Sequence, residues 1–305
     1  MRQFSYEIYD VFTDTPLTGN ALAIVDDADN LTDLEMLQIT REFNLSETVF
    51  ICKSGNPAHS ASMRIFTPGG ELPFAGHPTV GAAIFVARKR FSDINSDQDA
   101  VVVLEEQVGP VRCGVKLRNE GVSSAVFDAP QLPCETSVKL GDKGDIAMAL
   151  GLDVQDIGFE NHIPTSWTAG VPFSFVPCKG LEEIKSIKPV IGLWDAAFGS
   201  GDHNNVYVYT RETELGAHQF HARMFAPAMG ITEDAATGSA AAAFAGVVFQ
   251  FDKPADGTHI CSIEQGFEMN RPSVIQLELD ILGSKMHGMR VGGNAVAVAK
   301  GVLSL

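Results

Sequence analysis

The 305-residue chain carries 22 Lys and Arg against 38 Asp and Glu, so its formal net charge is −16 with its eight histidines neutral. This excess of negative charge repels a phosphate backbone and an anionic membrane surface, so neither nucleic acid nor membrane is an expected partner. With 45% hydrophobic and 20% charged residues, the composition is that of a globular protein with a large core, and the length favours two domains.

Targeting signals and cysteines add little to this picture. The first residues, MRQFSYEIYDVF, alternate polar and apolar instead of forming the apolar stretch of a secretory signal, so we expect a cytoplasmic protein. The longest apolar run, residues 240–249, is about half of the ~20 residues that a membrane-spanning helix requires. The cysteines are far apart, odd in number and without a CxxC pair, so we expect reduced, structural thiols: Cys52, Cys113, Cys134, Cys178 and Cys261.

The first half of the chain is rich in segments that alternate polar and apolar residues, which is typical of strands. Between the second and third of them, Asp33–Phe43 has apolar residues at helical spacing, with Thr32 placed as its N-cap. The predicted strands are Ser5–Phe12, Ala21–Val25, Thr48–Cys52, Ala61–Phe66, Ala100–Leu104, Val111–Leu117 and Val122–Phe127.

A boundary is expected near residue 128, because Pro130 and Pro133 interrupt any regular element there. This gives an N-terminal lobe of residues 1–128 and a C-terminal lobe of residues 129–305, whose last strand, about 295–305, is free to pack on the first lobe. The second lobe is predicted to have a helix at Asp142–Leu150 and strands at Ser174–Pro177, Asn205–Tyr209, Phe220–Phe225, Val274–Leu279 and Ala295–Val302.

An internal repeat links the two halves. The segment MRIFTP at 63–68 recurs as ARMFAP at 222–227, and each copy leads into a helix of small residues, at 73–87 and at 233–249. Chance similarity over six residues is the alternative, but the shared downstream context favours duplication of one strand, loop and helix unit.

Each repeated helix begins at a glycine-containing turn, which is typical of an anion-binding site. Such a terminus presents unpaired backbone N–H groups and the positive end of the helix dipole. Two of them could enclose a small molecule that carries carboxylate groups. The alternative is that both are core helices, capped by Thr79 and Ser239. Phosphate binding is less favoured because neither loop has the GxxxxGK[ST] or GxGxxG spacing.

Ionisable residues gather at these two loops. His77 lies in the first, and Glu233 and Asp234 lie in the second. Glu47, in NLSETVF, follows the predicted helix and is flanked by apolar residues, so it is either a solvated turn residue or a general base. No metal site is expected: His218 and His221 are three apart in a predicted strand, where that spacing puts two side chains on opposite faces.

Five segments together resemble the PhzF family, named for an isomerase of phenazine biosynthesis. They are DVFTDTPLTGNALAIV at 10–25, NLSETVF at 44–50, RIFTPGGELPFAGHPTVGAA at 64–83, RMFAPAMGITEDAATGSAA at 223–241 and QGFEMNRPS at 265–273. The motifs fall in the right order at the right separations, and the resemblance spans nearly the whole chain. The resemblance implies the α+β fold shared with diaminopimelate epimerase. In that fold two similar lobes, each a curved sheet wrapped around a central helix, have the active site in the cleft between them.

The resemblance also implies roles for individual residues. The family's acid/base glutamate corresponds to Glu47, and the residues that hold the substrate and tune this group correspond to His77, Asp234 and Ser239. The loop residues around them are implied to bind substrate: Gly76, Thr79, Thr237 and Gly238. Ala235 replaces the family's usual proline, a change that removes turn stiffness but no chemistry.

The expected activity is a cofactor-independent isomerase that moves a proton between carbons of a small carboxylate-bearing substrate. No metal or cofactor is required by this chemistry, and we also expect a homodimer. The epimerase uses two cysteines at its helix termini, and neither loop here contains a cysteine, so a two-thiol racemase is not expected. Two alternatives stay open: a binding or interaction protein that has lost its chemistry, and an epimerase without thiols. The sequence leaves the substrate unnamed.

Overall fold

The computed structural model describes residues 1–92, 96–201 and 204–305. The chain divides into two compact units. Unit 1 comprises Met1–Pro130 and Gly292–Leu305, and unit 2 comprises Gln131–Val291. No helix within the described residues is long and apolar enough to cross a membrane.

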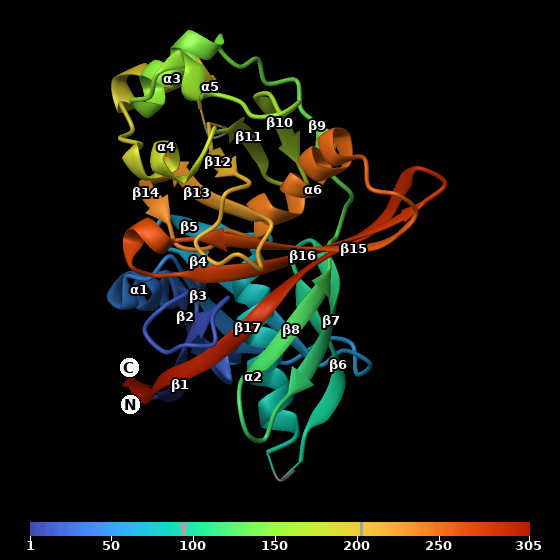
Figure 1. Cartoon of the computed structure of the whole chain (residues 1–305). Helices are drawn as coiled ribbons and strands as arrows, with labels where there is room; N and C mark the ends of the chain where they lie inside the picture. Colours follow the sequence, from blue (N-terminus) through green and yellow to red (C-terminus); the bar gives the residue numbers. More distant parts are fainter. Residues whose placement is uncertain (93–95, 202–203) are drawn as a thin grey trace. The chain divides into compact units, whose positions relative to one another are not determined.

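Unit 1 is a closed ring of strands. Antiparallel or parallel pairing connects β1–β2–β3–β4–β6–β7–β8–β17 and returns to β1, with β5 added at the edge of β4. The N- and C-terminal segments are therefore adjacent strands, as Figure 1 shows. The bounds are β1 Gln3–Val11, β2 Asn20–Val25, β3 Glu47–Cys52, β4 Ala61–Thr67, β5 Gly70–Leu72, β6 Gln98–Glu106, β7 Gly109–Leu117, β8 Ser123–Asp128 and β17 Lys285–Ser304.

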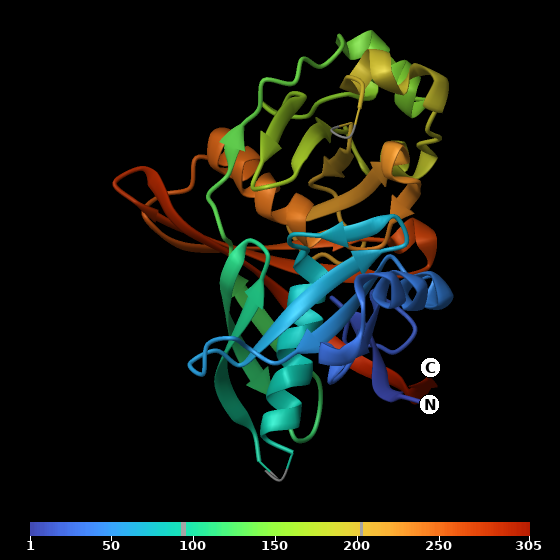
Figure 2. The ribbon, with the colours of Figure 1, turned by 180° about the vertical axis from the view of Figure 1, so that it is seen from behind.

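Helix α2 (Gly76–Arg90) is the core of this ring. Every residue from Gly76 to Ala87 is buried, and the helix packs against strands on several sides of the ring (Figure 2). At Gly81 an added Cβ would lie 2.6 Å from Leu22 Cδ2, so the absence of a side chain allows the helix to approach β2 closely. Helix α1 (Asp33–Phe43) covers the outside and begins at Thr32 in a capping box with Glu35, which confirms the predicted N-cap.

Unit 2 is built on the same plan around helix α6 (Gly238–Asp252). Its strands pair in the order β9–β10–β11–β12–β13–β15–β16, with β14 beside β13. The bounds are β9 Cys134–Glu135, β10 Thr165–Thr168, β11 Pro172–Pro177, β12 Val206–Thr210, β13 Phe220–Ala226, β14 Ile231–Asp234, β15 Gly257–Gln265 and β16 Ser273–Leu282. The other α-helices of the described chain are α3 Lys143–Leu150, α4 Leu181–Ser186 and α5 Trp194–Phe198, and short 3₁₀ turns occur at Ala28–Asn30, Val154–Asp156, Ile191–Leu193, Pro227–Met229 and Phe267–Met269.

Aromatic residues fill the core of unit 2. The Phe244 ring of α6 lies within about 6 Å of the rings of Phe175, Tyr209 and Phe220, measured between ring centroids. Small residues dominate the rest of the helix, and at Gly246 a Cβ would lie 2.2 Å from the Trp167 ring. The alanine-rich helix is thus buried because large side chains come from the surrounding strands.

The predicted repeat is confirmed in the strand order of the two units. Strand β4 is antiparallel to β3 and β5 and parallel to β6, and β13 is antiparallel to β12 and β14 and parallel to β15. The repeated arginines make matching ion pairs. Arg64 binds both carboxylate oxygens of Glu71 at 2.6 and 2.7 Å, and Arg223 binds both of Glu233 at 2.8 Å.

Candidate active site

Glu47 and His77 meet in unit 1. Glu47 is the first residue of β3, paired with Leu22 of β2, and its side chain is 14% exposed. His77 is the second residue of α2 and its side chain is 4% exposed. Glu47 Oε2 lies 3.6 Å from His77 Nε2, slightly beyond hydrogen-bonding distance. The chain therefore brings two residues of the predicted site together, from segments 30 positions apart in sequence.

His77 is a neutral group. Burial lowers the pKa of its imidazole to about 3, because the charged form loses its hydration there. A neutral imidazole can donate one proton and accept another, so the ring can orient a neighbouring carboxyl group in either protonation state. It does not add a positive charge beside Glu47.

Within the described residues, the two central helices begin without a side-chain cap, as do the short helices α4 and α5. Helices α1 and α3 have side-chain caps, from Thr32 and Asp142. In contrast, the N-caps of α2 and α6 are Ala75 and Thr237, and neither makes a side-chain capping bond to the described residues. An uncapped helix start leaves backbone donors available to a ligand, which makes both termini suitable for binding an anionic group.

The alternative that Thr79 and Ser239 cap these helices is wrong. Thr79 is buried in the fourth position of α2, where its hydroxyl lies 2.8 Å from the Ala75 carbonyl oxygen and 2.9 Å from Glu106 Oε1. Ser239 is the second residue of α6 and is partly exposed. Both follow the cap position instead of occupying it, because each helix starts at the preceding glycine, Gly76 or Gly238.

Asp234 and Thr237 form a buried network at the start of α6. The Thr237 hydroxyl donates to Asp234 Oδ2 at 2.5 Å. The Gln265 amide donates from Nε2 to the Asp234 carbonyl oxygen at 2.8 Å and to Thr237 Oγ1 at 3.0 Å, and its Oε1 accepts from the Thr237 N–H at 3.1 Å. These bonds fix the conformation of the turn that precedes the helix.

Sequence reasoning missed two residues of these networks, Gln265 and Glu106. Gln265 is fully buried, and Glu106, at the end of β6, is 8% exposed. Gln265 begins the quoted motif QGFEMNRPS but had no assigned role. The signal that could have found both is the repeat itself: they are separated by the same 159 positions as Arg64 and Arg223.

The histidine spacing argument was wrong in its geometry. His218 precedes β13 instead of lying within it, and the rings of His218 and His221 both contact Glu264, at 2.9 and 2.8 Å. Despite strong burial, bonds to Glu264 and Glu268 raise the pKa of His221 to about 9, so it is a buried cation held by carboxylates. No group of three or more metal-binding side chains with suitable geometry occurs among the described residues.

The cysteines do not supply a thiolate at either terminus. Burial raises the pKa of Cys52 and Cys261 to about 11, and it raises the pKa values of Cys113 and Cys178 still further. Cys134 is exposed, on β9.

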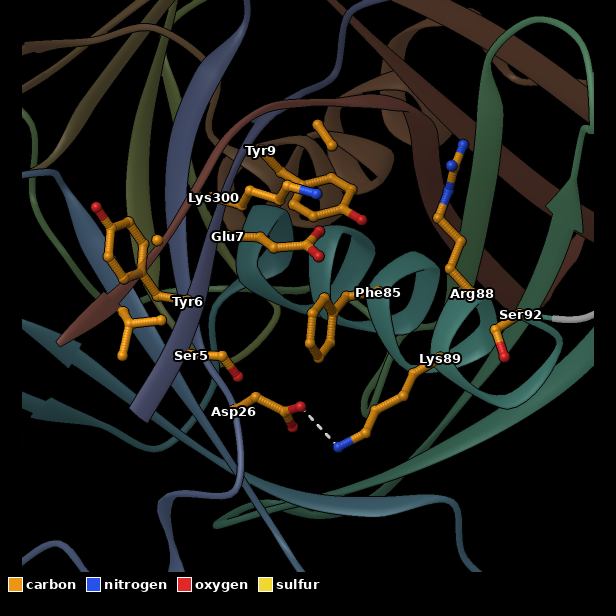
Figure 3. A pocket seen from close by; sticks show the side chains of 13 residues that line it. Ser5, Tyr6, Glu7, Tyr9, Asp26, Phe85, Arg88, Lys89, Ser92 and Lys300 are labelled. Carbon is orange, nitrogen blue, oxygen red and sulfur yellow. Dashed lines mark hydrogen bonds and ion pairs between the residues drawn. The ribbon is translucent and has the colours of Figure 1, made fainter. Parts of the chain in front are cut away.

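A cavity of about 760 Å³ in unit 1 is a separate feature. It lies by the last turns of α2, where Phe85 and Lys89 face it, and by the outer half of β1 (Figure 3). The ion pair between Lys89 Nζ and Asp26 Oδ2, at 2.6 Å, crosses one side. Because His77 is about two to three helical turns away, at roughly 5.4 Å per turn, this cavity does not belong to the Glu47 and His77 site.

Comparison with solved structures first gives the class of fold. The chain matches a probable proline racemase from Agrobacterium radiobacter with a TM-score of 0.63 at 10% identity, over 99% of this chain and 93% of that one, which shows a shared fold. It matches a phenazine biosynthesis protein of the PhzF family from Bacillus anthracis with a TM-score of 0.86 at 25% identity, over the whole of both chains.

The family follows from sequence. The family model for phenazine biosynthesis-like proteins matches residues 9–301, and the chain belongs to this family, the PhzF family. It is 46% identical to an uncharacterized isomerase of Mesorhizobium japonicum and 33% identical to trans-2,3-dihydro-3-hydroxyanthranilate isomerase of Pseudomonas fluorescens, each over 99% of both proteins. The family resemblance is thus confirmed, and the enzyme class is isomerase.

Proposed function

We propose that the chain catalyses proton transfer between carbons of a small carboxylate-bearing substrate, with Glu47 as the acid and base. The observation that carries the proposal is the position of Glu47 Oε2, largely shielded from water and 3.6 Å from a neutral imidazole. A carboxylate in such a place can take a proton from carbon and return a proton elsewhere on the same conjugated system. The step needs no cofactor.

The second half of the proposal concerns substrate binding. The N–H groups at the start of α6, near Gly238 and Ser239, and those of Gly76 and His77 at the start of α2 have no acceptor within their own helices. A substrate carboxylate would gain both these hydrogen bonds and the favourable end of the helix dipole, worth about 0.3–1 kcal/mol and more where water is excluded. Asp234, Thr79 and Thr237 would shape the turns that present these donors.

The relatives narrow the choice of substrate to test. Proteins 31–34% identical to this chain are named trans-2,3-dihydro-3-hydroxyanthranilate isomerases. That compound carries a ring carboxylate and a carbon-bound proton next to conjugated double bonds, which suits the proposed chemistry. We therefore propose it, or a cyclohexadiene carboxylate of similar size, as the substrate class.

The test is isomerisation and hydrogen exchange in heavy water with trans-2,3-dihydro-3-hydroxyanthranilate, followed by NMR. We expect turnover by the wild type and a loss of about 10²–10⁴-fold in Glu47→Gln, the range typical of a general acid or base. Glu42→Gln is the matched control, because Glu42 is an exposed glutamate on the neighbouring helix α1.

Three outcomes are informative. Equal rates in wild type and Glu47→Gln would remove the acid/base assignment. Tight binding of the compound without any exchange would favour the alternative of a binding protein. Inversion at a carbon centre, detected by optical rotation, would favour an epimerase that uses no thiols.

A further inference from the structure

Glu106 is a buried carboxyl group that the proposed reaction does not use. It ends strand β6, its side chain points to the first turn of α2, and its Oε2 is buried with no hydrogen-bond partner within the described residues. Its Oε1 lies 2.9 Å from the Thr79 hydroxyl, two residues along the helix from His77. A buried carboxylate with so few donors is costly unless it is neutral.

The geometry around Thr79 accommodates a proton on Glu106. Thr79 Oγ1 lies 2.8 Å from the Ala75 carbonyl oxygen as well as 2.9 Å from Glu106 Oε1. A hydroxyl has one hydrogen, and a carbonyl oxygen can only accept. When Thr79 donates to Ala75, its contact with Glu106 is a hydrogen bond only if Glu106 carries the proton and donates it to Thr79.

Unit 2 has an amide at the strand position that corresponds to Glu106. Gln265 stands 159 positions after Glu106, at the same register of the parallel strand pair: Ser62 faces Glu105 across β4 and β6, and His221 faces Glu264 across β13 and β15. There the Gln265 N–H donates to the Thr237 hydroxyl, which donates to Asp234. In both units the residue at this strand position contacts a threonine hydroxyl near the start of the central helix, and in unit 2 that residue is permanently neutral.

We infer that Glu106 acts as a neutral carboxylic acid, the unit 1 counterpart of the Gln265 amide, and is a positioning residue that holds the first turn of α2 and thereby His77. Burial raises the pKa of Glu106 to about 8, although a bond donated by the Thr79 hydroxyl to the ionised carboxylate would act in the opposite direction. The titratable neighbour on β7 is the Cys113 thiol, whose own pKa burial raises, and α2 contributes Thr79. Loss of the proton would free Thr79 to turn towards the carboxylate and would leave a charge beneath the turn.

The first test is a direct reading of the proton, which does not depend on turnover. Infrared difference spectra between wild type and Glu106→Gln should contain the carbonyl stretch of a protonated carboxylic acid at pH 7, and this band should disappear as the pH rises through about 8. Absence of the band at neutral pH would overturn the inference. Glu105→Gln is a matched control, since Glu105 is the adjacent residue and the pKa of its carboxyl is lowered to about 2, chiefly by the Ser54 hydroxyl.

The second test reads positioning at His77. Its imidazole NMR signals, assigned with His77→Asn, should shift with a midpoint near pH 8 in the wild type and stay constant in Glu106→Gln. Thr79→Ser, which keeps the hydroxyl, should retain the shift, and Thr79→Val should abolish it. An unchanged midpoint in Glu106→Gln would overturn the positioning role.

Only one consequence of the inference rests on the proposed function, namely the pH dependence of catalysis. Above pH 8 the wild-type kcat/KM should fall about tenfold per pH unit, while Glu106→Gln stays level. If Glu47→Gln proves fully active, the proposed function fails, but the infrared and NMR results still decide the state and role of Glu106.

Discussion

The two units use one strand and helix plan, yet the starts of their central helices are chemically different. In unit 1 the start of α2 is next to Glu47 and Glu106, two carboxyl groups, and to a neutral histidine. In unit 2 the start of α6 is held by Gln265, which makes three hydrogen bonds to the turn between Asp234 and Thr237. The carboxyl groups at the start of α2 can exchange protons. The Gln265 amide at the start of α6 cannot, and its hydrogen bonds are already formed within the turn.

This difference shows how the two copies of a duplicated fold can take different roles, one in binding and one in chemistry. Hydrogen bonds from Gln265 leave the α6 turn with little freedom, which suits binding of a fixed group such as a carboxylate. The α2 turn has an alanine N-cap and titratable neighbours, which suits chemistry. We therefore expect substitutions in unit 1 to alter the rate of the chemical step and those in unit 2 to alter binding.

The largest expected effect is a split between kcat and KM. Glu47→Gln should lower kcat by about 10²–10⁴-fold with little change in KM, because it removes the proton-transferring group. Thr237→Val should mainly raise KM, because it removes the hydroxyl that donates to Asp234 and loosens the α6 turn. Steady-state kinetics with trans-2,3-dihydro-3-hydroxyanthranilate measure both. A fall in kcat of similar size for Thr237→Val would contradict the division of roles.

The next effect is on stability and compares the two repeated ion pairs. The side chains of Arg223 and Glu233 are 8% and 14% exposed, and Arg223 Nη1 also donates to the Ile184 carbonyl oxygen. Glu233→Gln removes the carboxylate that binds this buried guanidinium with both oxygens and should cost about 3–5 kcal/mol in the free energy of unfolding.

The counterpart in unit 1 is the matched comparison. The side chains of Arg64 and Glu71 are 28% and 21% exposed, and Arg64 retains a second partner in Asp33. Glu71→Gln should therefore cost about 1 kcal/mol or less. Urea unfolding of both variants gives the two values, and equal losses would show that burial does not distinguish the pairs.

Much of the fold could be predicted because its signals are local. The polar and apolar alternation identified the strands that contain residues 5–11 and 111–117, and the capping pattern at Thr32 located the start of α1. The repeat was visible because Arg and Pro recur at fixed positions in segments with the same strand partners. The short strand Thr165–Thr168 and helix Leu181–Ser186 were missed, since four to six residues carry too little periodicity.

The site was only partly predictable for a different reason. Glu47 and His77 came from motifs, but their separation of 3.6 Å depends on how β3 and α2 pack, which no local pattern contains. Likewise, His218 and His221 converge on Glu264 because a turn precedes β13, so the strand rule used for them did not apply. Glu106 lies outside every motif that the sequence analysis used, and only the register of the repeat relates it to Gln265.

A smaller effect is expected at the glycines of the two central helices. Gly246→Ala places a Cβ 2.2 Å from Trp167 Cε3, in a rigid ring, and should lower the free energy of unfolding by about 1–3 kcal/mol. In Gly81→Ala the new Cβ contacts Leu22 Cδ2, the end of a flexible side chain. The loss of unfolding free energy should therefore be smaller, since alanine also favours the helix. Gly192→Ala, with nothing within 4 Å, is the control. A larger loss of unfolding free energy in Gly81→Ala than in Gly246→Ala would mean that Leu22 on β2 cannot move aside.

The last expected effect appears only below about pH 6.5 and is the acid sensitivity that His77 gives to unit 1. Its pKa is about 3 in the folded protein and about 6.5 when unfolded, so between these values the unfolded chain binds more protons. Stability from this group is therefore complete above pH 6.5 and falls as the pH drops towards 3, by up to about 1.4 kcal/mol per pH unit.

His77→Asn, which cannot titrate, should show a shallower loss of unfolding free energy between pH 6.5 and 4.5. The comparison is made by urea unfolding at several pH values. The control is His287→Asn, which removes an exposed histidine and so shows how much the loss of a histidine from the unfolded chain alone changes the curve. Parallel curves for wild type and His77→Asn would mean that the imidazole is protonated without leaving its buried position, and the neutral His77 assigned to the site would be wrong.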